Sequence, residues 1–290
     1  MGYMHIKNLY KSQAILMFKE CFALEKVHGT SAHVTWKDGQ VIYFAGGAKH
    51  ETFVSLFDDA SLRAAFAELG HPDVTVYGEA YGGKINGQSW RYGKTLRFVA
   101  FEVQIGESWL PVVNAEAVAQ RLGFAFVHYR RVACSIDAID AERDAPSEEA
   151  KRAGMADQDY PREGVVLRPL VEVRLGGNHR VIAKHKRDEE RETKSPRTVQ
   201  DIDGMAVLSG AEQIAAEWVT PTRLQHVLDH LGGSPGMERT PDVISAMTED
   251  VLREAGGEIV DSKEARKAIG RATVALFKKS IQDRLRESAA

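Results

Sequence analysis

The stretch CFALEKV, residues 21–27, is an apolar run that leads into a lysine, and it sets the pattern for the first two-thirds of the chain. Similar runs, rich in aromatic and β-branched residues, recur up to residue 186, and Gly or Asp turns separate several of them. This texture is typical of β-strands. The further runs are SAHVTW (31–36), VIYFA (41–45), VTVYGEAYG (74–82), LRFVAFEVQI (96–105), EGVVLRP (163–169) and HRVIAKHK (179–186). We therefore expect an antiparallel, mixed α+β domain.

Two helical intervals interrupt the predicted strands, DDASLRAAFAELG (58–70) and NAEAVAQRLG (114–123). Asp58 or Asp59 is the expected N-cap of the first helix, and Asn114 is the expected N-cap of the second. Each interval ends on a glycine, which is the residue preferred just after a helix.

The C-terminal part of the chain has the punctuation of helices. Thr220-Pro221 and Thr240-Pro241 each offer an N-cap followed by proline at the first helical position, and Gly232 and Gly256 close these helices. Apolar residues at helical spacing are Val243, Ile244, Met247, Val251, Ile269, Leu276, Phe277 and Ile281. We expect a first domain over residues 1–200 and a small helical domain over residues 201–290.

The composition is that of an ordinary globular protein, with 43% hydrophobic and 27% charged residues. The net charge of −3 would weakly repel phosphates, so any contact with nucleic acid must come from a local basic patch. The charged stretch 137–162 predicts an exposed helix or loop, to which we assign no chemistry. The first residues lack the apolar core and small-residue cleavage site of a secretory signal, and no run approaches membrane-spanning length, so we expect neither feature. Cys21 and Cys134 are expected to be inert thiols. So few cysteines indicate a cytoplasmic protein, which would lie in a host cytoplasm if the chain is phage-encoded.

Lys26-Val27-His28-Gly29 matches the Lys-x-x-Gly nucleophile motif of covalent nucleotidyltransferases. The same spacing occurs at Lys84, Lys151 and Lys267, so the spacing alone selects no residue. Lys267 lies in a predicted helix and Lys151 in the charged stretch, whereas Lys26 follows directly on an apolar strand. Because a strand end holds a side chain rigidly, Lys26 is the predicted nucleophile.

Three further motifs follow Lys26 in a fixed order. The complete set is Glu25-Lys26-Val27-His28-Gly29-Thr30, Tyr77-Gly78-Glu79, Glu163-Gly164-Val165-Val166-Leu167-Arg168 and Ala183-Lys184-His185-Lys186. These segments resemble motifs I, III, IV and V of the nucleotidyltransferase superfamily of ligases and capping enzymes. His28 together with EGVVLRP resembles the RNA ligase 2 family specifically. The resemblance covers about residues 20–190, and WVTPTRLQHVLDHL (218–231) is more loosely similar to the start of that family's C-terminal domain.

The resemblance implies an ATP-grasp-like ligase adenylation domain, built on antiparallel sheets and followed by an all-helical C-terminal domain. It also implies an ATP-dependent RNA ligase that works in three steps. Lys26 attacks ATP to form enzyme-AMP, AMP passes to an RNA 5′-phosphate, and a 3′-hydroxyl then displaces AMP. The implied partner is RNA, most often a nicked duplex, bound by a monomer with no membrane contact.

The first step needs a neutral amine on Lys26. At an ordinary pKa of about 10.4, only about one lysine in 2,500 is neutral at pH 7. Burial and nearby cations lower the pKa of a lysine, and Lys184 and Lys186, joined by Mg²⁺, are the expected cations. Lowering the pKa to about 7 corresponds to about 4 to 5 kcal/mol. Lys184 and Lys186 alternate with His185 on a strand, so they share one face and can hold the α-phosphate.

Carboxylates and one aromatic complete the expected nucleotide site. Glu79 and Glu163 offer oxygen ligands for Mg²⁺ or Mn²⁺, although the family also places the first of them near the ribose. Glu25 should point to the opposite side of its strand, yet it belongs to the family pattern and orients the adenine or a metal-bound water. Phe101 matches the aromatic that stacks on adenine, although an aromatic in an alternating strand is usually core; His28 is open to the same structural interpretation. The expected catalytic residues are Lys26, Lys184, Lys186 and Glu163, and the expected ATP-binding residues are Glu25, Lys26, Val27, His28, Gly29, Glu79, Phe101, Glu163, Lys184 and Lys186.

Four residues are candidates for RNA contacts. Ser31 stands where the family usually has Asn, and Lys49 is the only cation found where the family has Arg between motifs I and III. Lys49 supplies charge without the bidentate geometry of a guanidinium. Arg187 and Arg191 begin a basic run that either grips RNA phosphates or forms a solvated face.

Three alternatives remain open from sequence. A DNA ligase or capping enzyme would use the same covalent step but predicts an oligonucleotide-binding fold after residue 200, where this chain looks helical. A non-catalytic nucleic-acid-binding relative would keep the fold and lose the nucleophile. His226 and His230 have a spacing that can ligate zinc, but Val227 replaces the glutamate of the metalloprotease pattern and no third ligand is evident.

Overall fold

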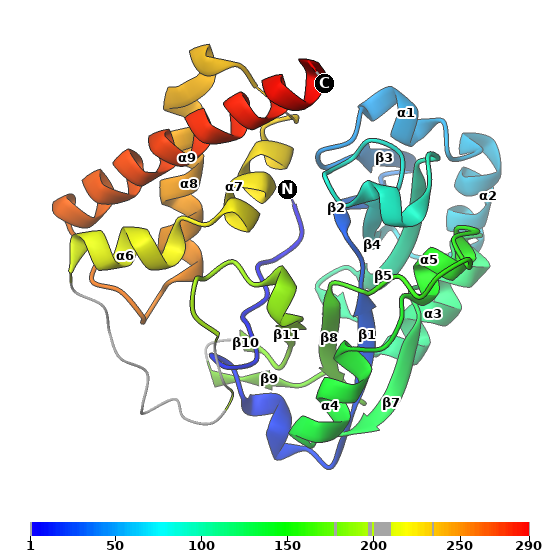
Figure 1. Cartoon of the computed structure of the whole chain (residues 1–290). Helices are drawn as coiled ribbons and strands as arrows, with labels where there is room; N and C mark the ends of the chain where they lie inside the picture. Colours follow the sequence, from blue (N-terminus) through cyan, green and yellow to red (C-terminus); the bar gives the residue numbers. More distant parts are fainter. Residues whose placement is uncertain (1, 177–178, 197–198, 200–209, 234, 290) are drawn as a thin grey trace. The chain divides into compact units, whose positions relative to one another are not determined.

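The computed structural model describes residues 2–176, 179–196, 199, 210–233 and 235–289. The chain forms two compact units, Met1–Arg187 and Asp188–Ala290 (Figure 1). The expected boundary between residues 200 and 201 lies outside the described residues. All described strands belong to the first unit.

The first unit is built on two antiparallel sheets. The four-stranded sheet has the order β11-β8-β1-β7, and the five-stranded sheet has the order β3-β2-β4-β5-β6. A separate hairpin pairs β9 with β10. The strands are β1 (Glu20–Lys26), β2 (Gly29–Lys37), β3 (Gln40–Phe44), β4 (Asp73–Tyr81), β5 (Arg97–Ile105), β6 (Ser108–Trp109), β7 (Tyr129–Ala133), β8 (Gly164–Pro169), β9 (Arg174–Leu175), β10 (His179–Arg180) and β11 (Ala183–Lys186). The predicted antiparallel α+β domain is confirmed.

Helices cover the outer faces of both sheets. Figure 1 shows α2 and α3 beside the five-stranded sheet and α4 beside the four-stranded sheet. The helices of this unit are η1 (Ala14–Met17), α1 (His50–Val54), α2 (Asp59–Leu69), η2 (Ser89–Tyr92), α3 (Val112–Arg121), α4 (Ile136–Arg143) and α5 (Glu148–Arg152). Asp58 caps α2 as predicted, and its carboxylate accepts from the Ala60 N–H. The predicted cap Asn114 is wrong. Pro111 is the N-cap of α3, so Asn114 lies inside the first turn of the helix.

The alternation along β4 separates the core from the functional face. Val74, Val76 and Ala80 are fully buried in one hydrophobic cluster that also contains Phe22 and Leu24 of β1. Because successive side chains of a strand point to opposite faces, Tyr77 and Glu79 point away from this cluster. The core thus fixes the side of the sheet on which Glu79 lies.

A bulge in β5 redirects Phe101. Tyr77 pairs with Glu102 and Gly78 pairs with Ala100, so Phe101 is the extra residue on its strand. The Phe101 ring meets the Tyr3 ring edge-on at 5.0 Å, and Tyr3 also contacts the Tyr77 ring at 5.2 Å. Phe101 is therefore partly buried on the same face as Tyr77.

Buried ion pairs connect the two sheets. Arg168 of β8 lies 2.9 Å from Glu102 of β5, and both side chains are almost fully buried. Arg180 donates to the same Glu102 carboxylate at 3.0 Å.

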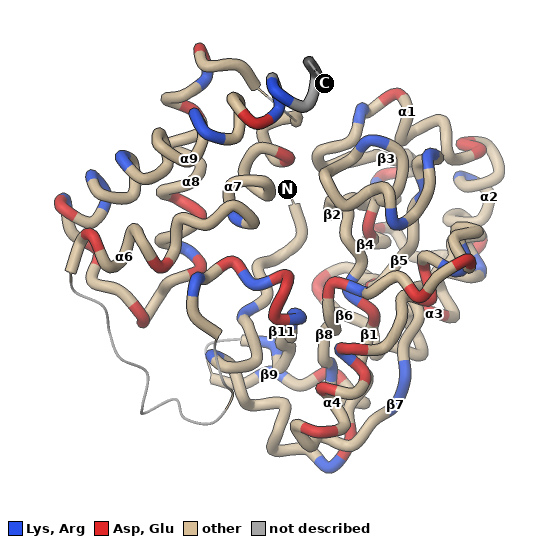
Figure 2. The backbone as a smooth tube through the Cα atoms, viewed as in Figure 1, with Lys and Arg blue, Asp and Glu red and all other residues tan. Residues whose placement is uncertain are grey.

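Over the rest of the described chain, Lys and Arg positions are interspersed with Asp and Glu positions in both units (Figure 2).

The second unit is helical throughout its described residues. It contains η4 (Asp188–Glu190), α6 (Ala211–Trp218), α7 (Pro221–His230), η5 (Met237–Arg239), α8 (Thr240–Glu254) and α9 (Lys263–Ala289). Thr220 caps α7 as predicted. Thr240 is not a cap, because its hydroxyl donates to the Met237 carbonyl and it forms the first residue of α8. The helical prediction for this region is confirmed, and the described residues contain no strand of an oligonucleotide-binding fold.

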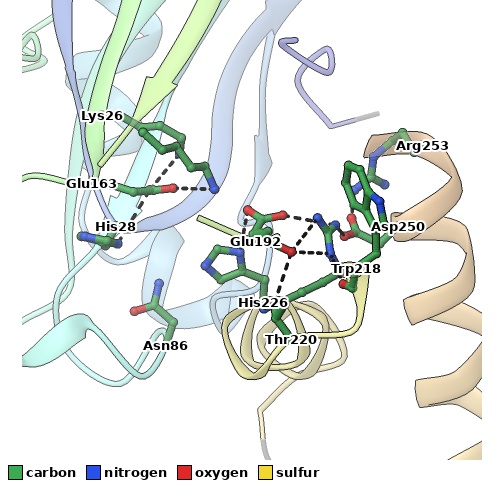
Figure 3. A network of polar contacts seen from close by, with 12 residues as sticks. Lys26, His28, Asn86, Glu163, Glu192, Trp218, Thr220, His226, Asp250 and Arg253 are labelled. Atoms are coloured by element: carbon green, nitrogen blue, oxygen red, sulfur yellow. Dashed lines mark hydrogen bonds and ion pairs between the residues drawn. The ribbon is translucent and has the colours of Figure 1, made fainter. Parts of the chain in front are cut away.

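Polar contacts connect residues 192–195 to the helices of this unit, and Figure 3 shows those of Glu192 with Thr220 and His226. The buried Arg223 guanidinium lies 3.2 Å from the Glu192 carboxylate and donates to the Trp218 carbonyl at 3.0 Å; it also pairs with Asp250. Ser195 donates through both its N–H and its hydroxyl to Glu217, each at 2.9 Å. Residues 192–195 are thus an integral part of the helical unit.

Gly78 offers a test of the packing beneath the functional face. A Cβ at this position would lie 2.3 Å from the Val99 carbonyl oxygen and 2.4 Å from the Phe98 ring. We expect Gly78→Ala to destabilise the first unit by about 1 to 3 kcal/mol through overpacking. The measurement is the urea midpoint of unfolding. Gly176→Ala is the control, because a Cβ there meets nothing within 4 Å; equal midpoints for the two variants would contradict the packing described.

Candidate active site

Lys26 is the last residue of β1, and its amine meets a buried carboxylate (Figure 3). The Lys26 Nζ lies 2.9 Å from Glu163 Oε2, and the Lys26 side chain is 25% exposed. The other oxygen, Glu163 Oε1, lies 2.9 Å from Lys186 Nζ. The structure therefore brings together three of the predicted site residues, with one carboxylate held between two lysines.

The pairing of three strands produces this arrangement. Lys26 and Lys186 are both the Cα partners of Gly164, which lies between them on β8. A Cβ on Gly164 would lie 2.2 Å from the His185 carbonyl oxygen, so only glycine permits β11 to approach this closely. Lys184 is two residues before Lys186 and thus shares its face of the sheet. The Lys184 side chain is largely buried.

Glu79 approaches the same place from the five-stranded sheet. Burial raises the pKa of Glu79 to about 8; Lys26 opposes this rise, and the like charge of Glu163 adds to it. The Gly29 N–H donates to the Glu79 carboxylate. A Cβ on Gly29 would lie 2.3 Å from the Ala80 carbonyl oxygen and 2.7 Å from the Glu79 side chain, which explains the glycine of the motif.

A pair of carboxylates that repel each other favours the binding of a cation. Among the described residues, no group of three or more His, Cys, Asp or Glu side chains is placed to hold a metal ion. Mg²⁺ commonly uses only one or two carboxylates and takes its other ligands from substrate phosphates and water. Glu79 and Glu163 fit that kind of site.

His28 is held as a neutral side chain beside Glu163. Burial lowers the pKa of His28 to about 3, and the positive charge of Arg91 and Lys26 lowers it further against the opposing effect of Glu163. The Arg91 Nη1 lies 2.5 Å from His28 Nε2. A guanidinium has no acceptor, so His28 Nε2 accepts and the ring proton is on Nδ1, which lies 3.7 Å from Glu163 Oε2. Arg91 thereby turns the N–H of His28 toward Glu163.

Two further residues of the loop after β4 bind the backbone that follows Lys26. The His28 N–H donates to the Tyr92 hydroxyl at 3.1 Å, and the Asn86 side chain donates to the Gly29 carbonyl at 3.2 Å. Sequence reasoning missed Asn86, Arg91 and Tyr92. Their only sequence signal is a glycine-rich loop with basic and aromatic residues directly after the Tyr77-Gly78-Glu79 motif.

Glu25 lies on the opposite face of β1 from Lys26. Its buried carboxylate accepts from the Glu148 N–H at 2.9 Å and the Glu149 N–H at 3.4 Å, and it pairs with the Ser147 hydroxyl. The structure therefore places Glu25 at the N-terminus of α5, where it holds the strand that carries Lys26. This agrees with its expected direction along the strand.

A comparison with known families decides the relationship of the chain. The model of the RNA ligase family matches residues 19–186, which is more than half of the chain. The chain belongs to the RNA ligase family. The family predicted from the four sequence motifs is thus confirmed. No curated protein matches the chain significantly.

Solved structures of RNA ligases are similar to this family member. One is an archaeal ATP-dependent RNA ligase, with 16% identity and a TM-score of 0.49 over 97% of this chain and 65% of that chain. Another is the Naegleria gruberi RNA ligase with PPi, with 14% identity and a TM-score of 0.48 over 65% of this chain and 56% of that chain. A mutant of the Naegleria enzyme with ATP and Mn shows 13% identity and a TM-score of 0.47 over 65% and 57% of the two chains. This RNA ligase family member spans 56% to 65% of the length of these solved chains.

The predicted RNA-contact residues of this RNA ligase family member are placed individually. Ser31 is the Cα partner of Glu79, and its buried hydroxyl has no hydrogen-bond partner among the described residues. Lys49 is exposed just before α1. Arg187 lies 4.0 Å from Asp144. Arg191 donates to the Asp188 carbonyl within the helical unit.

The remaining candidates from sequence are accounted for by ordinary contacts. His226 lies 3.1 Å from Glu192, and His230 is buried enough that its pKa is lowered. Burial raises the pKa of Cys21 and Cys134, as expected for unreactive thiols. No helix within the described ranges combines the length and apolar character of a bilayer-spanning segment.

Glu25 predicts a pH dependence of folding stability. Burial raises its pKa from 4.5 to about 7, with Arg162 opposing the rise. Between these values the folded state binds more protons than the unfolded state, so stability falls with rising pH, by about 3 kcal/mol in total. Glu25→Gln removes this ionisation. We expect the free energy of unfolding of the variant, relative to that of the wild type, to be higher at about pH 7.5 than at about pH 5. Denaturant titrations at the two pH values measure this difference.

Glu68→Gln is the matched control for this measurement. The Glu68 side chain is 81% exposed on α2, so the difference between this variant and the wild type should be the same at both pH values. A difference between Glu25→Gln and the wild type that does not change with pH would show that Glu25 is ionised in the fold throughout this range.

Proposed function

We propose that this RNA ligase family member seals RNA ends with ATP through a covalent lysyl-AMP intermediate on Lys26. The observation that carries the proposal is the position of Lys26 at 2.9 Å from Glu163, whose second oxygen holds Lys186 at the same distance. A nucleophilic amine, a carboxylate and a phosphate-binding cation are thereby fixed at three neighbouring strands of one sheet. This is the set that transfer of an adenylyl group to lysine requires.

The arrangement also suggests how the Lys26 amine is released for the reaction. In the absence of nucleotide, the ion pair holds this amine on the Glu163 carboxylate. Entry of the triphosphate beside Lys184 and Lys186 gives the lysines a new anionic partner and separates Lys26 from the carboxylate. When bound, Mg²⁺ or Mn²⁺ would be held by Glu79 and Glu163 and would neutralise the pyrophosphate leaving group.

His28 and Ser31 complete the proposed nucleotide and phosphate contacts. His28 stays neutral because of its burial, and its Nδ1 lies 3.7 Å from Glu163 Oε2. The Ser31 hydroxyl, on the face of Glu79, can donate to a phosphate oxygen where the family usually has an amide. Phe101 offers the aromatic face for adenine once its edge contact with Tyr3 rearranges. This rearrangement of Tyr3 is required because the centroids of the Tyr3 and Phe101 rings are only 5.0 Å apart.

The second and third steps are proposed from the family. AMP passes from Lys26 to an RNA 5′-phosphate, and an RNA 3′-hydroxyl then displaces AMP. A nicked RNA duplex is the proposed substrate, with Lys49, Arg187 and Arg191 as proposed phosphate contacts. We also propose a monomer that acts in RNA repair in the cytoplasm, or in a host cytoplasm if the chain is phage-encoded.

Labelling with α-labelled ATP and a divalent cation tests the covalent step. We expect the label to remain on the wild-type protein under denaturing conditions and to be lost in Lys26→Ala. Lys151→Ala and Lys267→Ala are matched controls, since both lysines have the same Lys-x-x-Gly spacing, and they should label as the wild type does. Labelling that survives in Lys26→Ala, or is absent from the wild type, would reject the proposal. Sealing of nicked RNA but not of all-DNA nicks would support the RNA assignment.

Glu163→Gln tests the role of the carboxylate. It keeps the size of the side chain but removes the charge that holds Lys26 and Lys186. We expect the rate of protein labelling to fall by about 100-fold or more, as for the loss of one electrostatic partner in other active sites. The measurement is a single-turnover time course. Glu116→Gln on α3 should leave the rate unchanged, and equal rates for the two variants would exclude a role for Glu163 in this step.

A further inference from the structure

The loop between β4 and β5, residues 82–96, differs in charge from the rest of the chain. It contains Lys84, Arg91 and Lys94 and no acidic residue, although the chain as a whole has a net charge of −3. Lys84 and Lys94 are exposed. This loop therefore supplies a local basic patch of the kind that an acidic protein needs to attract phosphates.

The basic loop is fixed to the backbone around the nucleophile. Tyr92 accepts from the His28 N–H, and Asn86 donates to the Gly29 carbonyl. Arg91 lies 2.5 Å from the His28 ring. Because these contacts come from both sides of position 90, they place the backbone of Trp90 close to the segment that follows Lys26.

Trp90 is a large apolar side chain that the core does not use. It is 57% exposed, whereas Tyr92, two residues later, is fully buried. One edge of the Trp90 ring system meets the Tyr160 ring at 5.6 Å, and the Arg91 guanidinium lies 5.6 Å from the ring centre. Exposed aromatic rings flanked by cations are the usual means of binding nucleic-acid strands by stacking.

We propose that Trp90 stacks on a base at the RNA end that is to be joined, while Lys84, Arg91 and Lys94 pair with the phosphates of the same strand. The charge of the loop selects a polyanion, and the exposed ring selects one that carries flat bases. The proposal rests on the proposed function, since it assigns the RNA-end subsite of that active site. It also gives the chain a guanidinium beside motif I, where sequence offered only Lys49.

Binding of a fluorescent RNA with a 5′-phosphate, followed by anisotropy, tests the stacking contact. We expect Trp90→Ala to weaken binding by about 5- to 100-fold, the range for loss of one base–aromatic stack, and Trp90→Phe to stay within about threefold of the wild type. Met17→Ala is the control, because Met17 is 72% exposed on η1. Labelling of each variant with ATP should match the wild type, since Trp90 is not part of the nucleotide site.

The basic residues are tested by the salt dependence of the same binding. Lys84→Ala and Lys94→Ala should each reduce the slope of log affinity against log salt by about 0.7 to 0.9. Arg121→Ala, an exposed arginine on α3, should leave the slope unchanged. Slopes that are unchanged in both lysine variants would overturn the phosphate contacts.

The outcomes separate this proposal from the proposed function. Equal RNA affinity of Trp90→Ala and the wild type would overturn the stacking contact while leaving the covalent step intact. Loss of ATP labelling in both Trp90→Ala and Trp90→Phe would place Trp90 in the nucleotide site or the fold and would also overturn it. If the wild type fails to label but its RNA affinity depends on Trp90, the stacking contact stands and the ligase activity fails.

Discussion

The site depends on the close approach of three strands at Gly164. With no side chain at this position, β11 and β1 can both pair with β8, and the amines of Lys186 and Lys26 then lie on either side of the preceding glutamate. A Cβ would meet the β11 backbone at 2.2 Å, so any other residue would push Lys186 away from Glu163. The chemistry of the site therefore follows from one backbone contact.

Buried charges behind the strands keep this arrangement rigid. Glu25 binds the N-terminus of α5 on the reverse face of β1, and Arg162 pairs with Glu142 at 2.8 Å close by. Arg168 and Glu102 connect β8 to β5. Removing one member of a buried pair leaves an uncompensated charge, which is far more costly than losing a surface pair. Such pairs are weak evidence for stability, but they fix the relative position of the two sheets on which Lys26 and Glu79 lie.

The sequence predicts the local features of this fold well. Alternation and turn residues identify the strands, and caps such as Asp58 and Thr220 are found where a polar side chain precedes a helical interval. Asn114 and Thr240 fail because a helix can begin without a side-chain cap, so a polar residue near its start need not be the cap. Motif order identifies the family, since four spaced motifs are hard to obtain by chance.

The non-local features could not be predicted. The charged stretch 137–162 looks solvated in sequence, yet it contributes Glu142, Glu149 and Arg162 to the interior, where Glu142 and Arg162 pair with each other and Glu149 accepts from the His128 N–H. Asn86, Arg91 and Tyr92 belong to a loop without periodicity, and they contact His28 and Gly29, which are more than 50 positions away. Pairing between distant segments leaves no periodic pattern, so it is found only in the folded chain.

The resting ion pair between Lys26 and Glu163 gives the proposed chemistry a built-in order. While it persists, the Lys26 amine is held on the Glu163 carboxylate. Glu79 lies close to the same charged groups. Burial and the like charge of Glu163 raise the pKa of Glu79. The two carboxylates are therefore most stable when they share a cation or a proton. Phosphates that bind at Lys184 and Lys186 change both the Lys26–Glu163 ion pair and the repulsion between the two carboxylates. They become the new partners of the lysines, and the cations that they bring neutralise the carboxylates. Under the proposed function, substrate binding and the release of Lys26 from Glu163 are then a single electrostatic event.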